Sequence, residues 1–448
     1  MMRRGLDRVK ADRHLIGYSS GNFGKNLLLG SVDVTLLFLL TDLLGIAARQ
    51  VSMLMLVVFL ADLMLDLGAG LLAAWAQNRG VGYRRLIVWG APPCAAAFAF
   101  IYSLPLLGEG NLPMIAVAVI FFRGAYAIID VPHNSLLARV ASDSRARGRA
   151  SGYRTVFSSA ASVVIATVLV PFMGADGRPA TAGQLALLGA VGGLMFCGAM
   201  FFAAWSAREE GAGAGLATAR SAARAVFLPK LDRLFGAIAV IALVTGFAMP
   251  VFGKMMLYIA TYVLQQPGLA GRLLLTITLG QLAGVALWIY LVRSHDKTDL
   301  LAASHAVAVG GVVCFWMAGD GALLLTASAV LIGIGFGGVF MLPWGILADI
   351  TDFAAFRHRE RRETATFATV LVILKAGGVA SLAVIGAILG WLGYVPGVAQ
   401  TASVVLGMKL LAFGVPLLGS SIAILVLRRL AIGHQMHARV VRANKRWA

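Results

Sequence analysis

The stretch VSMLMLVVFLADLMLDLGAGLLAAW, from Val51 to Trp75, decides the fold class of this chain. It is long enough to cross the hydrocarbon core of a bilayer, for which about 20 helical residues suffice. A backbone in lipid must satisfy its own hydrogen bonds, so such a span folds as an α-helix. Asp62 and Asp66 interrupt it, and their i, i+4 spacing puts both carboxylates on one helix face. The stretch therefore predicts a membrane helix with two charges that need a function or a partner.

The composition of the whole chain is that of a membrane protein. Of its 448 residues, 59% are hydrophobic and 13% are charged, against about 25% charged in a soluble domain. The mean hydropathy is +0.85. The net charge of +18 would suggest nucleic acid in a soluble protein, but cytoplasmic loops of membrane proteins also collect Lys and Arg. We expect an all-α polytopic protein that contacts the lipid bilayer and no nucleic acid.

Twelve apolar spans can be placed along the chain. A polar, Gly- and Ala-rich interruption divides them six and six. This division predicts an N-terminal six-helix bundle over 1–206, a cytoplasmic linker over 207–233, a second bundle over 234–430 and a basic cytoplasmic tail over 431–448. The predicted spans are 15–41, 50–76, 86–107, 112–138, 152–174, 183–206, 234–264, 272–293, 299–318, 321–347, 364–394 and 400–427.

Lys and Arg are distributed unevenly over the loops. The termini and the even-numbered gaps carry almost all of them, whereas the odd-numbered gaps hold only Arg49, Arg178 and Arg272. Because positively charged loops stay in the cytoplasm, both termini are predicted to be cytoplasmic. Twelve spans in two bundles are typical of transporters whose site lies at mid-membrane between the halves. We expect a monomeric, multi-pass protein of the cell (inner) membrane.

A small set of charged residues remains inside the spans. An aspartate is too short to reach the interface from mid-span, so a functional role is expected for the acids. Two carboxylates one turn apart in a low dielectric cannot both stay ionised alone, so they hold a proton or a cation neutralises them. Asp130, on another span, is a third candidate for that ion. The acids are Asp33, Asp62, Asp66 and Asp130, and the bases are Lys25, Arg123, Arg154, Lys254, Lys375 and Lys409.

Four segments, in this order, resemble one known family. They are similar to segments of the glycoside–pentoside–hexuronide:cation symporters of the major facilitator superfamily, typified by the melibiose permease. The resemblance implies the major facilitator fold and symport of a sugar, glycoside or sugar acid with H⁺ or Na⁺, by alternating access, with no enzymatic activity and no cofactor. The segments are GNFGKN (Gly21–Asn26), DLMLDLGAGLLAAWAQNRGVGYRR (Asp62–Arg85), YAIIDVPHNSLLARVASDSRARGRASGYRTVF (Tyr126–Phe157), and LPWGILADITDFAAFRHRERRE (Leu342–Glu363) continuing to ILKAGG (Ile373–Gly378).

The resemblance also implies roles for individual residues. Asp62, Asp66 and Asp130 would form the cation site, and they would be metal ligands only if the coupling ion is Na⁺. Asp349 and Asp352 match an acidic pair at the cytoplasmic end of the tenth helix, interpreted as a gate, with two solvated loop acids as the alternative. The residues implied in substrate binding are Lys25, Asn26, Tyr126, Asp130, Asn134, Arg154, Phe340 and Lys375.

Departures from the family pattern refine these expectations. The family's sugar-binding aspartate after the FGK lysine is Asn26, and its aromatic sugar platforms fall on Asn134 and Phe340. Sodium-using members place polar side chains beside the aspartates, where this chain has Leu65 and Ala127. Since neither side chain offers a ligand, the sequence favours H⁺ over Na⁺ as the coupling ion.

The extra bases leave the solute open. Arg123 and Lys254 would favour an anionic ligand if their charges face the cavity, or would each satisfy an acid internally. Loss of the sugar aspartate is also compatible with a lysolipid or another amphiphile on the same fold. An enzyme would need a nucleophile with its base, or a metal cluster, and the seven histidines show no metal-ligand spacing.

Overall fold

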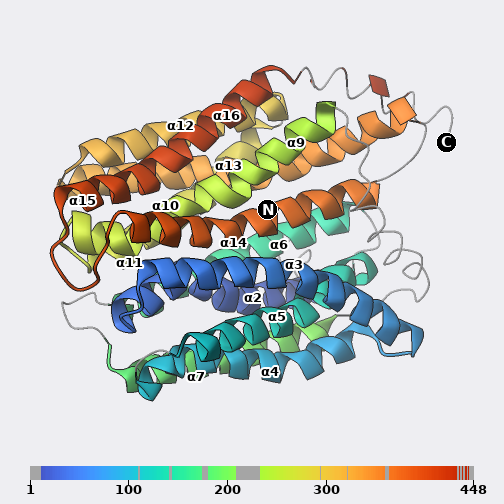
Figure 1. Cartoon of the computed structure of the whole chain (residues 1–448). Helices are drawn as coiled ribbons and strands as arrows, with labels where there is room; N and C mark the ends of the chain where they lie inside the picture. Colours follow the sequence, from blue (N-terminus) through green and yellow to red (C-terminus); the bar gives the residue numbers. More distant parts are fainter. Residues whose placement is uncertain are drawn as a thin grey trace. The chain divides into compact units, whose positions relative to one another are not determined.

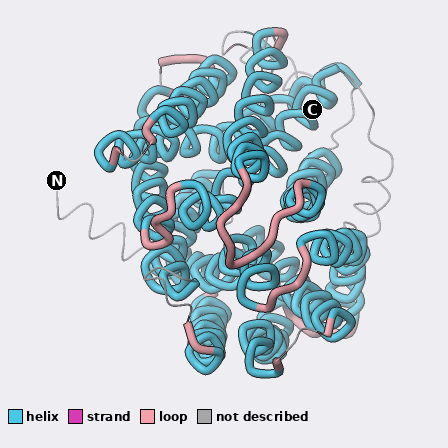
Figure 2. The backbone as a smooth tube through the Cα atoms, turned by 60° about the vertical axis from the view of Figure 1, so that its left-hand side comes forward, coloured by secondary structure: helices cyan, strands magenta, loops and turns pink. Residues whose placement is uncertain are grey.

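The computed structural model describes residues 12–108, 111–140, 144–173, 180–207, 233–292, 294–319, 321–358 and 363–430, with positions 433, 436, 439, 440 and 442 of the tail. Throughout these residues the chain consists of helices and connecting loops without strands (Figure 2). Twelve of the helices are long and apolar enough to cross a membrane. The predicted number of spans and the all-α class are therefore confirmed.

The chain forms two compact units, Met1–Arg220 and Ser221–Ala448, each with six of the membrane-spanning helices. The predicted linker 207–233 lies almost wholly outside the described residues, as does most of the tail 431–448. The cytoplasmic placement of both termini stays a prediction.

In the first unit, α3 packs less extensively against its neighbours than α2 or α4 does (Figure 1). α2 packs against α6 and α7, α4 packs against α5 and α7, and α3 packs mainly against α5. In its most apolar window α3 is only 22% buried, against 61% for the first span. Because α5 is its main neighbour in this unit, the acids of α3 have few places to find a partner. The helices are α2 (Arg13–Phe38), α3 (Ala48–Asn78), α4 (Tyr83–Ser103), α5 (Leu112–Val140), α6 (Ser144–Val164) and α7 (Ala182–Ser206).

In the second unit, α13 is the central helix. It packs against α11 and α12, while α12 also packs against α16. Glycines permit the crossing of α11 and α13: a Cβ on Gly284 would lie 2.5 Å from the Ile334 carbonyl oxygen, as expected where small residues let helices approach closely. The helices are α9 (Arg233–Leu243), α10 (Met249–Tyr258), α11 (Leu269–Leu291), α12 (Lys297–Met317), α13 (Ala322–His358), α14 (Glu363–Trp391), α15 (Ala402–Lys409) and α16 (Val415–Arg428).

Several spans contain a π-helical turn, a feature that shifts the helix register and is frequent at functional sites. At η5 (Val244–Ala248), Gly246 lies against the backbone of Leu374, the residue before Lys375. The other π-helical turns in the described residues are η1 (Leu39–Leu43), η3 (Ile165–Leu169), η6 (Ile259–Val263) and η7 (Leu410–Gly414).

The tenth span differs from its predicted length. α13 continues to His358, well past the predicted end at residue 347. The segment after Pro343 contains no further proline and no glycine beyond Gly345, so nothing local ends the helix there. Asp349 and Asp352 consequently lie on a helix rather than in a loop.

Candidate functional site

A buried ion pair joins α2 and α5 in the middle of the first unit. Lys25 Nζ lies 2.6 Å from Asp130 Oδ1, and the two side chains are each 7% exposed. Both residues lie well inside apolar spans, where an unpaired charge would be costly. Opposite charges from two helices therefore neutralise each other here.

Amide groups extend this pair toward α6. Asn134, one turn after Asp130, donates to Asp130 Oδ1 (3.0 Å) and accepts from Lys25 Nζ (3.0 Å). The same Asn134 oxygen accepts a hydrogen bond of 2.7 Å from Arg154 Nη2. Arg154 Nε also donates to Asn22 Oδ1 over 3.0 Å. Residues of the first, fourth and fifth spans thus form one polar network. It brings together Lys25, Asp130, Asn134 and Arg154, whose role in substrate binding stays a prediction.

His133 and Tyr18 form a buried support behind this network. Their rings stack with centroids 4.7 Å apart. Tyr18 OH donates to the His133 carbonyl (2.9 Å), and His133 Nε2 lies 3.1 Å from the Tyr18 carbonyl oxygen. With Nε2 donating to that carbonyl, Nδ1 is the acceptor that faces Lys25 Nζ at 3.4 Å. His133 therefore helps to orient the lysine.

Asn26 holds two helices together. Its Nδ2 donates to the Ser158 carbonyl (2.7 Å) and to Ser162 Oγ (2.9 Å), both on α6. The amide hydrogens are thus used between α2 and α6. Tyr126 is buried and packs near the ring of Phe122, with centroids 6.1 Å apart.

A second ion pair joins α3 and α5. Arg123 Nε lies 2.8 Å from Asp62 Oδ1, and Arg123 Nη2 donates to Asp62 Oδ2 over 3.0 Å. Asp66 and Asp33 are both half-buried and lie within electrostatic range of the same guanidinium. Arg123 therefore satisfies an acid internally, one of the two alternatives left open by the sequence.

Two of the three predicted cation-binding acids belong to these two ion pairs. Asp62 contacts Arg123 and Asp130 contacts Lys25. Within the described residues, no three His, Cys, Asp or Glu side chains lie close enough to hold a metal ion together. The assignment of Asp62, Asp66 and Asp130 to one cation site stays a prediction.

The remaining predicted residues lie in the second unit. Phe340, on α13, packs edge-on against Phe336 with ring centroids 5.6 Å apart. Lys375 lies half-buried on α14. Lys254, a base that the sequence left without a role, donates to the Gly378 carbonyl (2.5 Å) and to Ser381 Oγ (2.9 Å). These contacts connect α10 to α14 three residues beyond Lys375.

Lys297 contacts one acid of the predicted gate. Lys297 Nζ, at the first residue of α12, lies 2.8 Å from both oxygens of Asp349. Asp352 lies half-buried one turn further along α13. The gating role of this acidic pair stays a prediction.

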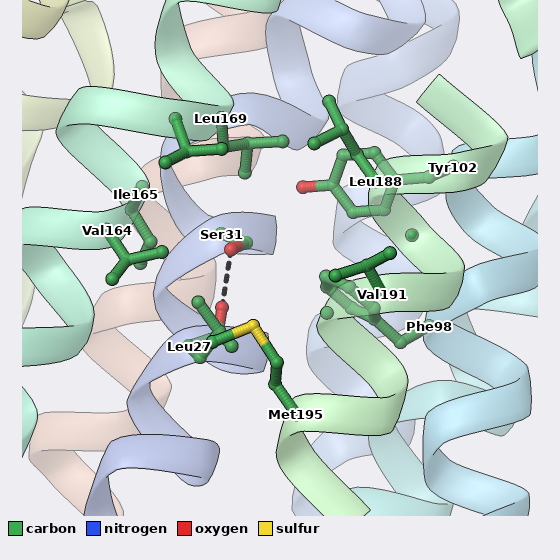
Figure 3. A pocket seen from close by; sticks show the side chains of 13 residues that line it. Leu27, Ser31, Phe98, Tyr102, Val164, Ile165, Leu169, Leu188, Val191 and Met195 are labelled. Carbon is green, nitrogen blue, oxygen red and sulfur yellow. Dashed lines mark hydrogen bonds between the residues drawn. The ribbon is translucent and has the colours of Figure 1, made fainter. Parts of the chain in front are cut away.

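Figure 3 shows a pocket in the first unit, and no residue of the polar network lines it. Side chains of α2, α4, η3 and α7 line it, and the hydroxyls among them belong to Ser31 and Tyr102. Ser31 Oγ donates to the Leu27 carbonyl, and Tyr102 OH lies 2.6 Å from Thr35 Oγ1. The space is about 60 Å³, far below the roughly 300 Å³ at which ligand pockets begin. It does not accommodate a sugar.

Sequence reasoning missed Asn22, His133 and Tyr18. The signal was present as a stripe: Tyr18, Asn22 and Asn26 recur at intervals of four, and so do Arg154, Ser158 and Ser162 on α6. Side chains four apart share a helix face. Such polar stripes in apolar spans indicate the helix faces that pack against each other.

Comparison with known proteins places the chain among transporters. Residues 17–434 match the family described as MFS/sugar transport protein. The inner membrane symporter YicJ of Escherichia coli (strain K12) is 25% identical over 391 residues, which cover 86% of this chain and 83% of YicJ. The glucuronide carrier protein homolog of the same strain is 22% identical over 410 residues, 89% of this chain and 87% of that protein. The fold is similar to the crystal structure of nucleoside transporter NupG, with a TM-score of 0.59 at 12% identity over 93% of this chain and 98% of NupG.

Proposed function

The chain belongs to the MFS/sugar transport family, whose members are transporters and not enzymes, and on that premise we propose that it moves a sugar or sugar acid together with a cation, H⁺ in preference to Na⁺, across the cell (inner) membrane. It does so by alternating exposure of one site to the two sides. The polar network of Lys25, Asp130, Asn134 and Arg154 provides the hydrogen-bonding groups that a polyhydroxylated solute needs.

The proposal of ion coupling rests on a charge imbalance in the first unit. Inside the six predicted spans of the first unit, acids outnumber bases by one. Since net charge within a membrane is costly, one proton or one monovalent cation is the natural complement. The acids are Asp33, Asp62, Asp66 and Asp130, and the bases are Lys25, Arg123 and Arg154.

The surroundings of the α3 acids support a proton as that complement. The side chains of Leu65 and Ala127, at positions where sodium-using members of the family have polar side chains, have no oxygen to offer a metal ion. Na⁺ prefers several oxygen ligands at once. A proton requires a single carboxylate, so the site needs no further ligands.

Arg154 supports an anionic solute. Within the part of the chain that the structure describes, Arg154 donates to the amide oxygens of Asn22 and Asn134 and contacts no carboxylate. Lys25 and Arg123, by contrast, each contact an aspartate. A uronate carboxylate would neutralise the Arg154 guanidinium by a bidentate, charge-assisted hydrogen bond.

Uptake into vesicles under imposed gradients tests the proposed function. For one proton per solute, an inward gradient of one pH unit is expected to drive about tenfold accumulation. An inward Na⁺ gradient at equal pH on both sides is expected to add little. Accumulation that is independent of both gradients would contradict symport. Uptake of a lysolipid in place of any sugar would contradict the proposed class of solute.

The solute class is tested with two arginines of the same helix. Arg154→Gln is expected to weaken uronate binding about 10–100-fold, the value of a hydrogen bond to a charged group, and to weaken the binding of a neutral sugar much less. Arg149→Gln is the matched control, because Arg149 Nε lies 2.9 Å from Asp12 Oδ2 near the span end. Equal losses for both kinds of solute in Arg154→Gln would contradict an anionic substrate.

A further inference from the structure

Arg123 lies where an arginine is most costly. Its span runs from Leu112 to Leu137, so Arg123 is roughly 16 Å from one end and 21 Å from the other at 1.5 Å per residue. A side chain so deep cannot place its charge in water by extending along the helix. The position therefore requires a partner inside the protein.

Asp62 provides that partner through both of its oxygens. Arg123 Nε faces Oδ1 at 2.8 Å, and Nη2 donates to Oδ2 at 3.0 Å, with the side chains 11% and 13% exposed. The guanidinium thus contacts both carboxylate oxygens, with one hydrogen bond from Nη2, while Nε lies close to Oδ1 without a hydrogen bond to it. Gly124 allows the approach of α3, since a Cβ there would lie 3.1 Å from Leu65 Cδ2.

The contact occupies the place where an ion would bind. A Na⁺ ion shared by Asp62 and Asp66 needs at least one Asp62 oxygen, and the guanidinium contacts both. Because Arg123 is held on the adjacent helix, its effective concentration at Asp62 far exceeds that of a free ion in solution. Na⁺ can bind there only after displacing a tethered cation of the same charge.

We propose that Arg123 is a tethered cation that occupies Asp62 and thereby excludes Na⁺ and Li⁺ from the Asp62–Asp66 pair. The inference rests on the proposed function in taking this pair as the coupling site. Arg123 makes the chain insensitive to alkali cations, and its removal exposes the Asp62–Asp66 pair to Na⁺. Arg123 is then the residue that determines ion specificity.

Na⁺ binding to the purified full-length protein tests this without any transport assay. Thermal unfolding is measured at constant ionic strength with choline replaced stepwise by Na⁺ or Li⁺, because a ligand that binds only the folded state raises the Tm. The wild type is expected to show no saturable shift. Arg123→Gln is expected to gain a saturable shift of several degrees, and Arg123→Gln with Asp62→Asn to lose it again. Arg123→Lys keeps the charge and is expected to stay insensitive.

Two outcomes would overturn the inference. One is a saturable rise in the Tm of the wild type with Na⁺ that Asp62→Asn abolishes. This result would show that Arg123 does not exclude Na⁺, even if Arg123→Gln does not fold. The other is a folded Arg123→Gln with no response to Na⁺. If vesicle uptake shows no ion coupling while these shifts appear as expected, the exclusion of Na⁺ by Arg123 stands and only the proposed symport fails.

Discussion

Lys25→Met is expected to abolish uptake and to lower the free energy of unfolding by about 3–5 kcal/mol, the cost of leaving a buried charge without its partner. Asp130 is 5% exposed, and its ion pair with Lys25 lies far from either end of the span. Removing the lysine also takes a donor from Asn134, which accepts from Lys25 Nζ over 3.0 Å. Thermal unfolding of the purified protein and uptake into vesicles measure the two effects separately.

A double variant distinguishes a structural from a functional loss. Lys25→Met with Asp130→Asn contains no unpaired charge at this position, so its stability is expected to return close to that of the wild type while uptake stays absent. Arg149→Gln is the control for loss of an Arg–Asp pair near the span end, where a smaller loss of stability is expected because Tyr153 still donates to Asp12 Oδ2 over 3.1 Å. Normal uptake by the double variant would show that the pair only stabilises the fold.

Asp62→Asn with Asp66→Asn is expected to convert accumulation into simple equilibration. These carboxylates are predicted to bind the coupling ion, and without them the uptake of solute is no longer coupled to the pH gradient. Solute inside the vesicles should then rise only to the outside concentration. Time courses of labelled solute under an imposed pH gradient measure this directly.

The control for that variant is another aspartate of the first unit. Asp42→Asn changes a carboxylate that accepts a hydrogen bond of 2.6 Å from Thr41 at the end of the first span. It is expected to leave accumulation unchanged. Full accumulation by Asp62→Asn with Asp66→Asn would show that the coupling ion binds elsewhere.

The spans could be predicted because hydropathy is a local property. The predicted spans agree with the described helical segments to within a few residues, with two exceptions. α6 begins at Ser144 and not at the predicted 152, and α13 runs on to His358, in both cases through a polar segment that hydropathy does not identify as helical. The polar network was predicted in part: Lys25, Asp130, Asn134 and Arg154 were assigned to one site and do lie together. The supporting role of His133 was missed because it depends on a ring contact with Tyr18, which lies on another helix.

By itself the sequence determined the membrane class, the twelve helices, their division into six and six, and which residues carry charge into the bilayer. These follow from composition and from periodicity within one segment. Only the tertiary structure decided which charge meets which. Asp62 could have been shared with Asp66 and Asp130, yet it contacts Arg123, while Asp130 contacts Lys25. Such pairings depend on how two helices are placed and rotated against each other, because an ion pair forms only within about 4 Å.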